Sequence, residues 1–435
     1  MTANTSSQSS SLWARSAAFG TVSLVVAIAA IDLRQWSDRF DSIGDSTRIA
    51  AAPIAMLAVT AIVWRSPSSW LPSLRREPMA WLWAWILWAA VSGLAGPAPL
   101  SSLVFASTAG AIAVLATQLR SDRRLLPAAI AGAGALFVVV SAAARLGGAD
   151  MALSAGRLEL LAFEANQLAR FMGITCLAGL WLAASSRCSM RIIGLVAALA
   201  GAGMLALTQS RTGLAALIAA LAFLAYQRYG RRFALWAWAG GFGALAGMAA
   251  LNKVDGVLQL FSRGNLSDLT SATGRTDVWP PFARLVSERP LMGHGVGAVD
   301  VVGRRATIEG ELDFVAEHAH NLGLQVTVAT GVVGLGLLGI GIVKTWRAAE
   351  SPYALALLVF LAIDGLTEGV LLSPSFAWFA LVAVACAGER SNCASTSDRV
   401  ADSNSVSGSS RASRTDGDLA GRAVVKARAV PLPTD

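Results

Sequence analysis

The chain consists mostly of continuous apolar runs separated by short polar segments that are rich in arginine. Because apolar and polar residues do not alternate within the runs, the pattern predicts helices rather than the strands of a barrel. A helix of roughly 20 mostly apolar residues is long enough to span a bilayer. The fold class predicted is therefore an all-α polytopic membrane protein with about twelve transmembrane helices.

The predicted transmembrane domain covers residues 15–389, between two polar ends. Residues 1–14 form a predicted cytoplasmic tail, and residues 390–435 form a predicted disordered cytoplasmic tail, because both have few large apolar residues. The individual spans are expected near residues 16–31, 49–64, 79–94, 100–117, 127–144, 167–184, 192–207, 213–226, 234–251, 321–343, 354–371 and 376–387.

The distribution of positive charge predicts the orientation of these spans. Twelve spans place both termini on one side, and the short loops of that side hold thirteen Lys and Arg against six on the other. Positively charged short loops stay in the cytoplasm. The termini are therefore expected inside, and the long polar segment 252–320 is expected to be a periplasmic loop of short amphipathic helices.

Composition supports the membrane class and excludes a nucleic-acid-binding domain. Hydrophobic residues make up 55% of the 435 residues and charged residues only 14%, against about 25% charged residues in soluble proteins. The net charge of +8 comes from short loops and the tail. We therefore expect membrane lipids, and not nucleic acid, as partners.

The long polar segment holds all three histidines of the chain, and His320 directly precedes an apolar helix. An imidazole there can accept a proton from a sugar hydroxyl. Alternatively, Asn321 only caps the helix and His320 has no chemical role. His318 is a competing base two residues away. The spacing matches no zinc motif, so we predict no metal and no cofactor.

Two arginines are candidates for binding phosphate. Arg211 lies in a very tight predicted turn between two apolar helices, where its planar guanidinium can bind phosphate oxygens through two hydrogen bonds. It can equally extend to lipid headgroups. Arg275 lies in the long loop, where a solvated loop charge is the competing interpretation. The glycine-rich turn 293–297 can present backbone N–H groups to phosphate, although the pattern is not a nucleotide-binding motif.

Asp364 and Glu368 are four residues apart, so they are expected on one face in the outer half of the eleventh span. Acids inside a membrane helix are functional candidates. They can orient His320, pair with Arg211 or Arg275, relay protons, or form a structural ion pair that locks two helices.

Taken in order, several motifs resemble the O-antigen ligase and O-antigen polymerase family of bacterial envelope glycosyltransferases. The resemblance covers roughly residues 164–375. It rests on Asn166-Gln167-Leu168-Ala169, Ser210-Arg211-Thr212-Gly213, Gly274-Arg275 with Trp279, Pro290 and the Gly293–Gly297 turn, and His320-Asn321 followed by Gly331 and Gly334.

The resemblance implies a metal-independent, inverting enzyme with a GT-C-like fold in the bacterial inner membrane. It would transfer a glycan from undecaprenyl diphosphate to an acceptor hydroxyl at the periplasmic face. Arg211 and Arg275 would hold the diphosphate, and His320 would act as general base. Other residues expected at the substrate-binding site are Arg157, Asn166, Trp279, His318, Asp364 and Glu368.

The acceptor stays open at this point, because ligases and polymerases of this family share these motifs. Lipid A-core would be the acceptor of a ligase, and a growing polysaccharide that of a polymerase. A transporter of lipid-linked glycans is the alternative from another class. It is less favoured, because no matched repeats with broken helices are evident in the sequence.

Overall fold

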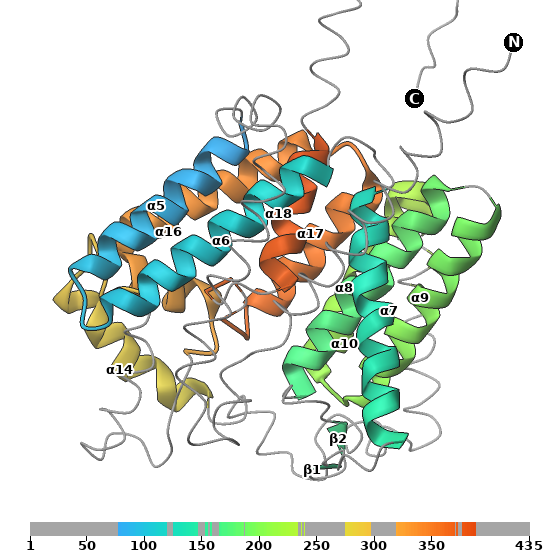
Figure 1. Ribbon diagram of the computed structural model, residues 1–435, viewed down its shortest axis with the longest axis horizontal. Coiled ribbons are helices and arrows are strands. Elements are labelled where there is room, and N and C mark those ends of the chain that lie inside the picture. Colours follow the sequence, from blue (N-terminus) through green and yellow to red (C-terminus); the bar gives the residue numbers. More distant parts are fainter. Residues whose placement is uncertain are drawn as a thin grey trace, which may run out of the picture. The chain divides into compact units, whose positions relative to one another are not determined.

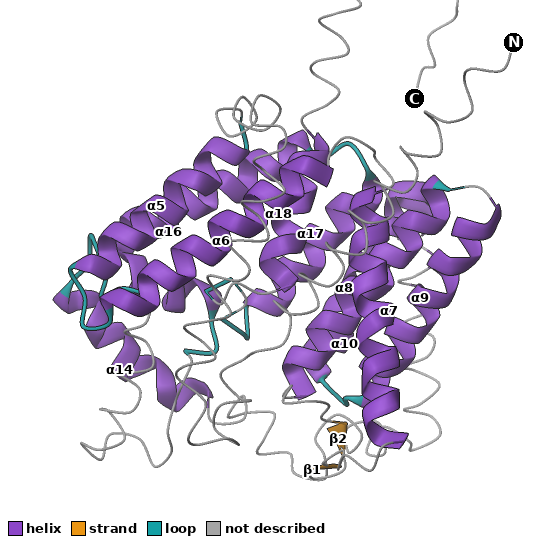
Figure 2. Ribbon diagram, in the orientation of Figure 1, coloured by secondary structure: helices purple, strands orange, loops and turns teal. Residues whose placement is uncertain are grey.

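The computed structural model describes residues 77–119, 125–146, 153–154, 157–158, 165–186, 188–233, 236, 239, 275–296, 319–369, 371–372 and 376–388. Almost all of them are helical (Figure 2). The first two predicted spans, almost all of the ninth, both terminal tails and most of the long loop lie outside the described residues. The count of about twelve spans stays a prediction.

The apolar helices follow the predicted spans in order, and the all-α membrane class is confirmed. They are α5 (Met79–Leu94), α6 (Pro99–Leu119), α7 (Leu125–Leu146), α8 (Ala165–Ser185), α9 (Cys188–Leu207), α10 (Arg211–Tyr229), α16 (Leu322–Ala348), α17 (Pro352–Gly365) and α18 (Phe376–Gly388). The long loop contributes α14 (Arg275–Glu288). Strands β1 (Leu153–Ser154) and β2 (Arg157–Leu158) pair antiparallel before α8.

Helices α8, α9, α10 and α16 are long and apolar enough to cross a bilayer, and the other apolar helices are shorter. The outward faces of the long helices carry large apolar side chains. Ile192, Val196 and Leu199 on α9 and Ile218 on α10 are each more than half exposed. Large apolar side chains on an outward face are unfavourable in water, and they fit the hydrocarbon core of a membrane.

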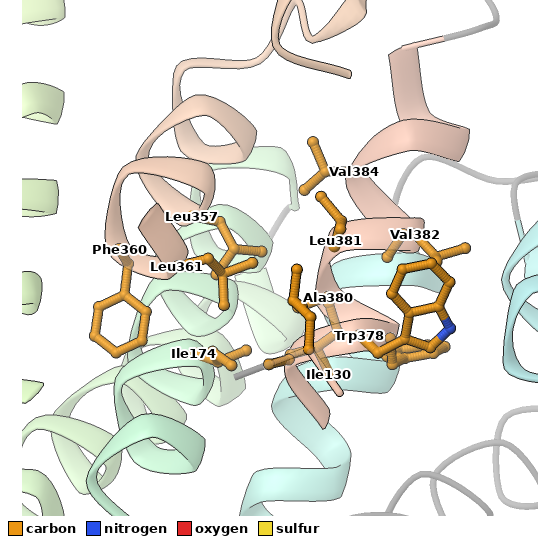
Figure 3. Packing of buried hydrophobic residues seen from close by; sticks show 14 of the residues in the cluster. Ile130, Ile174, Leu357, Phe360, Leu361, Trp378, Ala380, Leu381, Val382 and Val384 are labelled. Atoms are coloured by element: carbon orange, nitrogen blue, oxygen red, sulfur yellow. The ribbon is translucent and has the colours of Figure 1, made fainter. Parts of the chain in front are cut away.

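Helix α18 forms the centre of the apolar core. Each side chain from Ala377 to Cys386 is buried, as expected of a short helix that is hydrophobic on all sides. It contacts α5, α6, α7, α8, α16 and α17. Figure 3 shows Leu381 and Val384 of α18 beside Leu357 and Leu361 of α17. The residues that carry polar chemistry lie at the ends of the helices around this core.

Helix α16 is broken near its first third. Gly331 has φ 68° and ψ −178°, which is not a helical conformation. A break frees backbone groups of the preceding turn, and buried groups of this kind need other partners. Helix α5, which lies beside α16 (Figure 1), supplies two of them. Trp88 Nε1 donates to the carbonyl of Thr330 at 2.8 Å, and the Ser92 hydroxyl lies 2.8 Å from that of Ala329.

The segment after α14 supplies the remaining partners at the break. The N–H groups of His294 and Gly295 donate to the carbonyls of Val328 and Ala329, and the carbonyl of Pro290 accepts from Val332, all at 2.8 Å. Gly293, at φ 71°, lies against the backbone of residues 329–331. The turn that follows α14 is therefore part of the packing of α16.

This close approach makes Gly331 irreplaceable by alanine. A Cβ atom there would lie 2.1 Å from the carbonyl oxygen of Leu291, at a backbone conformation that costs other residues about 1–3 kcal/mol. We expect Gly331→Ala to lower the apparent Tm in detergent by several degrees. The matched control is Gly336→Ala on the same helix, where a Cβ would meet nothing within 4 Å. Equal Tm values for the two variants would contradict this account of the break.

Candidate active site

The turn between α9 and α10 is held by its own side chains. Gln209 has φ 51°, and the Ser210 hydroxyl caps α10 by accepting the N–H of Gly213 at 3.3 Å. The cap leaves Arg211 as the first residue of α10, half-buried, with the Nε and Nη2 atoms of its guanidinium shielded from solvent. The prediction of a tight turn that presents this arginine is confirmed.

Asn166, at the start of α8, links this turn to the end of α17. Its Oδ1 accepts the hydroxyl proton of Ser210 at 3.0 Å, and its Nδ2 donates to Oε1 of Glu368 at 3.0 Å. Three segments that are far apart in the sequence therefore meet through one amide.

Arg170, one turn further along α8, provides the counter-charge for both predicted acids. Its Nε lies 2.5 Å from Oδ2 of Asp364, and its Nη2 lies 3.9 Å from Oε2 of Glu368. The exposed fractions of these three side chains are 12%, 2% and 9%. The sequence analysis did not select Arg170. The signal was present, because a single arginine four residues after Asn166 lies on the same face of an apolar helix.

The end of α17 differs from the prediction, which extended this span to Leu371. The helix ends at Gly365, and N–H groups of Leu366 and Thr367 bond back to the carbonyls of Ile363 and Asp364. Glu368 thus lies in the following turn and not on a continuous helix. The turn still directs the carboxylate of Glu368 to α8, where it accepts from Asn166 and shares Arg170 with Asp364.

His320 lies beside this cluster in a left-handed backbone conformation, with φ 48°. Its Nδ1 is 3.5 Å from Oε2 of Glu368, and its side chain is 30% exposed. Asn321 caps α16 by accepting the N–H of Leu324 at 2.9 Å, and Trp279 Nε1 donates to the carbonyl of Ala319 at 3.1 Å. Both neighbours of His320 are therefore fixed, so capping by Asn321 and a role for His320 are compatible.

The glycine-rich turn does not support the idea of a phosphate cradle. The N–H groups of Gly293, His294, Gly295 and Val296 are bonded to Arg289, Val328, Ala329 and Ser102. His294 is buried, with Nε2 2.9 Å from the carbonyl oxygen of Leu285. The N–H groups of His294 and Gly295 bond to α16, that of Gly293 bonds to the residue after α14 and that of Val296 bonds to α6, so the turn has a structural role.

The described structure does not include the side chains of three other predicted residues. Arg275 begins α14 and Arg157 lies in β2, but the described structure does not extend to their side chains. His318 lies outside the described residues. The convergence of Arg275 with Arg211 and His320 therefore stays a prediction.

The Nδ1 atom of His320 is buried and lies 3.5 Å from Oε2 of Glu368. A carboxylate near Nδ1 favours the tautomer with the proton on that nitrogen, which leaves Nε2 as the acceptor.

A set of apolar helices with an ionisable cluster at their ends is typical of a multi-pass membrane protein with a functional site. A model of the family described as O-antigen ligase matches residues 194–339, which include Arg211 and His320. An O-antigen ligase of Pseudomonas aeruginosa (strain PAO1) is 29% identical over 348 residues, covering 77% of this chain and 75% of the relative. The chain resembles the O-antigen ligase family over residues 194–339.

Replacement of Arg170 tests the buried ion cluster. Loss of one partner from a buried ion pair costs about 3–5 kcal/mol, so we expect Arg170→Met to lower the apparent Tm strongly. Adding Asp364→Asn should restore part of it, because one uncompensated carboxylate is removed. The control is Arg191→Met, at an exposed arginine, which should leave the Tm within about 1 °C of the parent. A similar Tm for both arginine variants would refute the cluster.

Proposed function

We propose that this protein is a metal-independent, inverting glycosyltransferase of the bacterial inner membrane. It transfers a glycan from undecaprenyl diphosphate to an acceptor hydroxyl at the periplasmic face. The similarity to the O-antigen ligase family supports an enzyme that acts on lipid-linked polysaccharide. The observation that carries the chemical proposal is the contact between His320 and Glu368, beside the turn that presents Arg211.

The chemical roles follow from the charges of substrate and site. A diphosphate is a good leaving group once its negative charge is matched, and Arg211 and Arg275 supply this charge. The remaining requirement is removal of the proton from the attacking hydroxyl, which His320 carries out through Nε2. Attack from the side opposite the diphosphate inverts the anomeric carbon. Glu368 stabilises the imidazolium that forms.

The position of the cluster within the chain supports a site on the periplasmic side. It lies at the start of α8, the turn from α9 to α10, the end of α17 and the start of α16. Each of these positions falls on the outer side in the orientation that the positive charges predict. The lipid-linked donor would enter from the outer leaflet.

Among acceptors, we propose lipid A-core, which makes the protein a ligase. The similarity to the Pseudomonas aeruginosa protein named O-antigen ligase extends over most of both chains and favours this choice. A polymerase of the same family, with a growing polysaccharide as acceptor, would use the same site residues. An assay of purified protein with each acceptor separately distinguishes a ligase, which transfers to lipid A-core, from a polymerase, which transfers to the growing polysaccharide.

Loss of the imidazole should abolish transfer. We expect His320→Ala to lower the rate by about 10²–10⁴-fold, the usual contribution of a general base, with expression and Tm close to the parent. The measurement is transfer by purified protein from a lipid-diphosphate-linked glycan, in excess chelator, where the parent should stay active. Full activity of His320→Ala together with loss in His318→Ala would move the base to His318.

The binding geometry of Arg211 is tested by a change that keeps its charge. Lysine cannot form the two parallel hydrogen bonds of a guanidinium to phosphate oxygens, so we expect Arg211→Lys to reduce kcat/KM by at least tenfold. The control is Arg228→Lys, at an exposed arginine at the other end of α10, which should behave as the parent. Equal activity of both variants would exclude bidentate phosphate binding by Arg211.

A further inference from the structure

Asn166 was expected among the substrate-binding residues, but its amide is occupied by protein partners. Oδ1 accepts from the Ser210 hydroxyl and Nδ2 donates to Glu368 Oε1, both at 3.0 Å. The carboxylate of Glu368 only accepts hydrogen bonds, so the amide nitrogen of Asn166 faces it and the amide oxygen faces the Ser210 hydroxyl, which donates its proton.

The hydrogen bonds therefore form a chain with a defined direction. The N–H at the first turn of α10 donates to Ser210, Ser210 donates to Asn166, and Asn166 donates to Glu368. The second carboxylate oxygen of Glu368 is the one that faces Nδ1 of His320 at 3.5 Å. One end of the chain adjoins Arg211 and the other end orients the imidazole.

We propose that Asn166 is a positioning residue that couples the Ser210–Arg211 turn to His320 through Glu368, and that it does not bind substrate. This inference rests on the proposed function, in which Arg211 holds the leaving diphosphate and His320 is the base. Asn166 holds the Arg211 guanidinium and the His320 imidazole in a fixed relative position. The base therefore stays correctly placed relative to the sugar that is being transferred.

The two single substitutions should disturb the chain in different ways. Asn166→Asp places a second carboxylate against Glu368 and removes the donor. In Glu368→Gln, the new amide can turn its oxygen to Asn166 and its NH₂ to His320. The NH₂ then donates to Nδ1, so the imidazole carries its proton on Nε2 and has no free acceptor there. We expect each variant to lower kcat by roughly 10- to 100-fold, as loss of an orienting partner typically does.

The double substitution should restore the chain with only the bond between positions 166 and 368 reversed in direction. The carboxylate at position 166 accepts from Ser210 and from the amide at 368, and the amide oxygen then faces Nδ1 of His320. The negative charge moves to a position four residues before Arg170, where a helix brings side chains together. The counter-charge is therefore kept.

The experiment compares N166D, E368Q and the double variant of the full-length protein, with Q167E as control. Gln167 is half-buried beside Asn166, and its substitution introduces the same charge one residue away. The expected result is a lower Tm and lower kcat in both single variants, at an unchanged KM for the lipid-linked donor. The double variant should recover the Tm and raise kcat at least tenfold above the weaker single variant, and Q167E should match the parent.

Three results would overturn the proposal. An increased donor KM in N166D at unchanged kcat would make Asn166 a substrate-binding residue. A double variant that recovers Tm without kcat would make the chain merely structural, and strictly additive losses without recovery would show that positions 166 and 368 are not coupled. Failure of the proposed function would be seen separately, as full transfer by His320→Ala. The coupling between positions 166 and 368 could then still be measured through Tm.

Discussion

The structure depends on how two carboxylates are accommodated among apolar helices. Asp364 and Glu368 are both buried, and a buried carboxylate without partners would be unfavourable by several kcal/mol. Arg170 and Asn166 meet this requirement from a single face of α8. Docking of α8 against α17 therefore fixes the acids, and the acids in turn fix the surroundings of His320. The contacts that stabilise the packing of α8 against α17 are therefore the same ones that surround His320.

The order and approximate extent of the helices could be predicted because they depend on the local amino-acid sequence. A run of about 20 apolar residues has few alternatives in a bilayer, and Ser210 and Asn321 are good helix-capping residues in any context. In the structure Asn166 and His320 both contact Glu368. These residues lie next to span boundaries, which the apolar pattern marks.

The partners of the acids could not be predicted, because they depend on which helix faces lie together. Arg170 could have been selected as a single arginine in an apolar helix, but its position inside a span gives no information about its neighbour across the interface. The helical register of Asp364 and Glu368 was extended too far, because apolar residues continue after Gly365 while the backbone turns. Likewise, the sequence predicted that the turn at 293–297 presents N–H groups to phosphate, whereas Gly293 and Gly331 permit one backbone to approach another.

The repaired break in α16 means that the outer segment is not a detachable module. The turn from Pro290 to Gly295 completes the hydrogen bonding of a helix that follows it in sequence, and α5 completes the rest. Substitutions in this turn therefore have to be compatible with two helices, α5 and α16. A chimera that exchanges the long loop between relatives has to end the exchanged segment before Pro290, or else transplant α5 and the first half of α16 together with the loop.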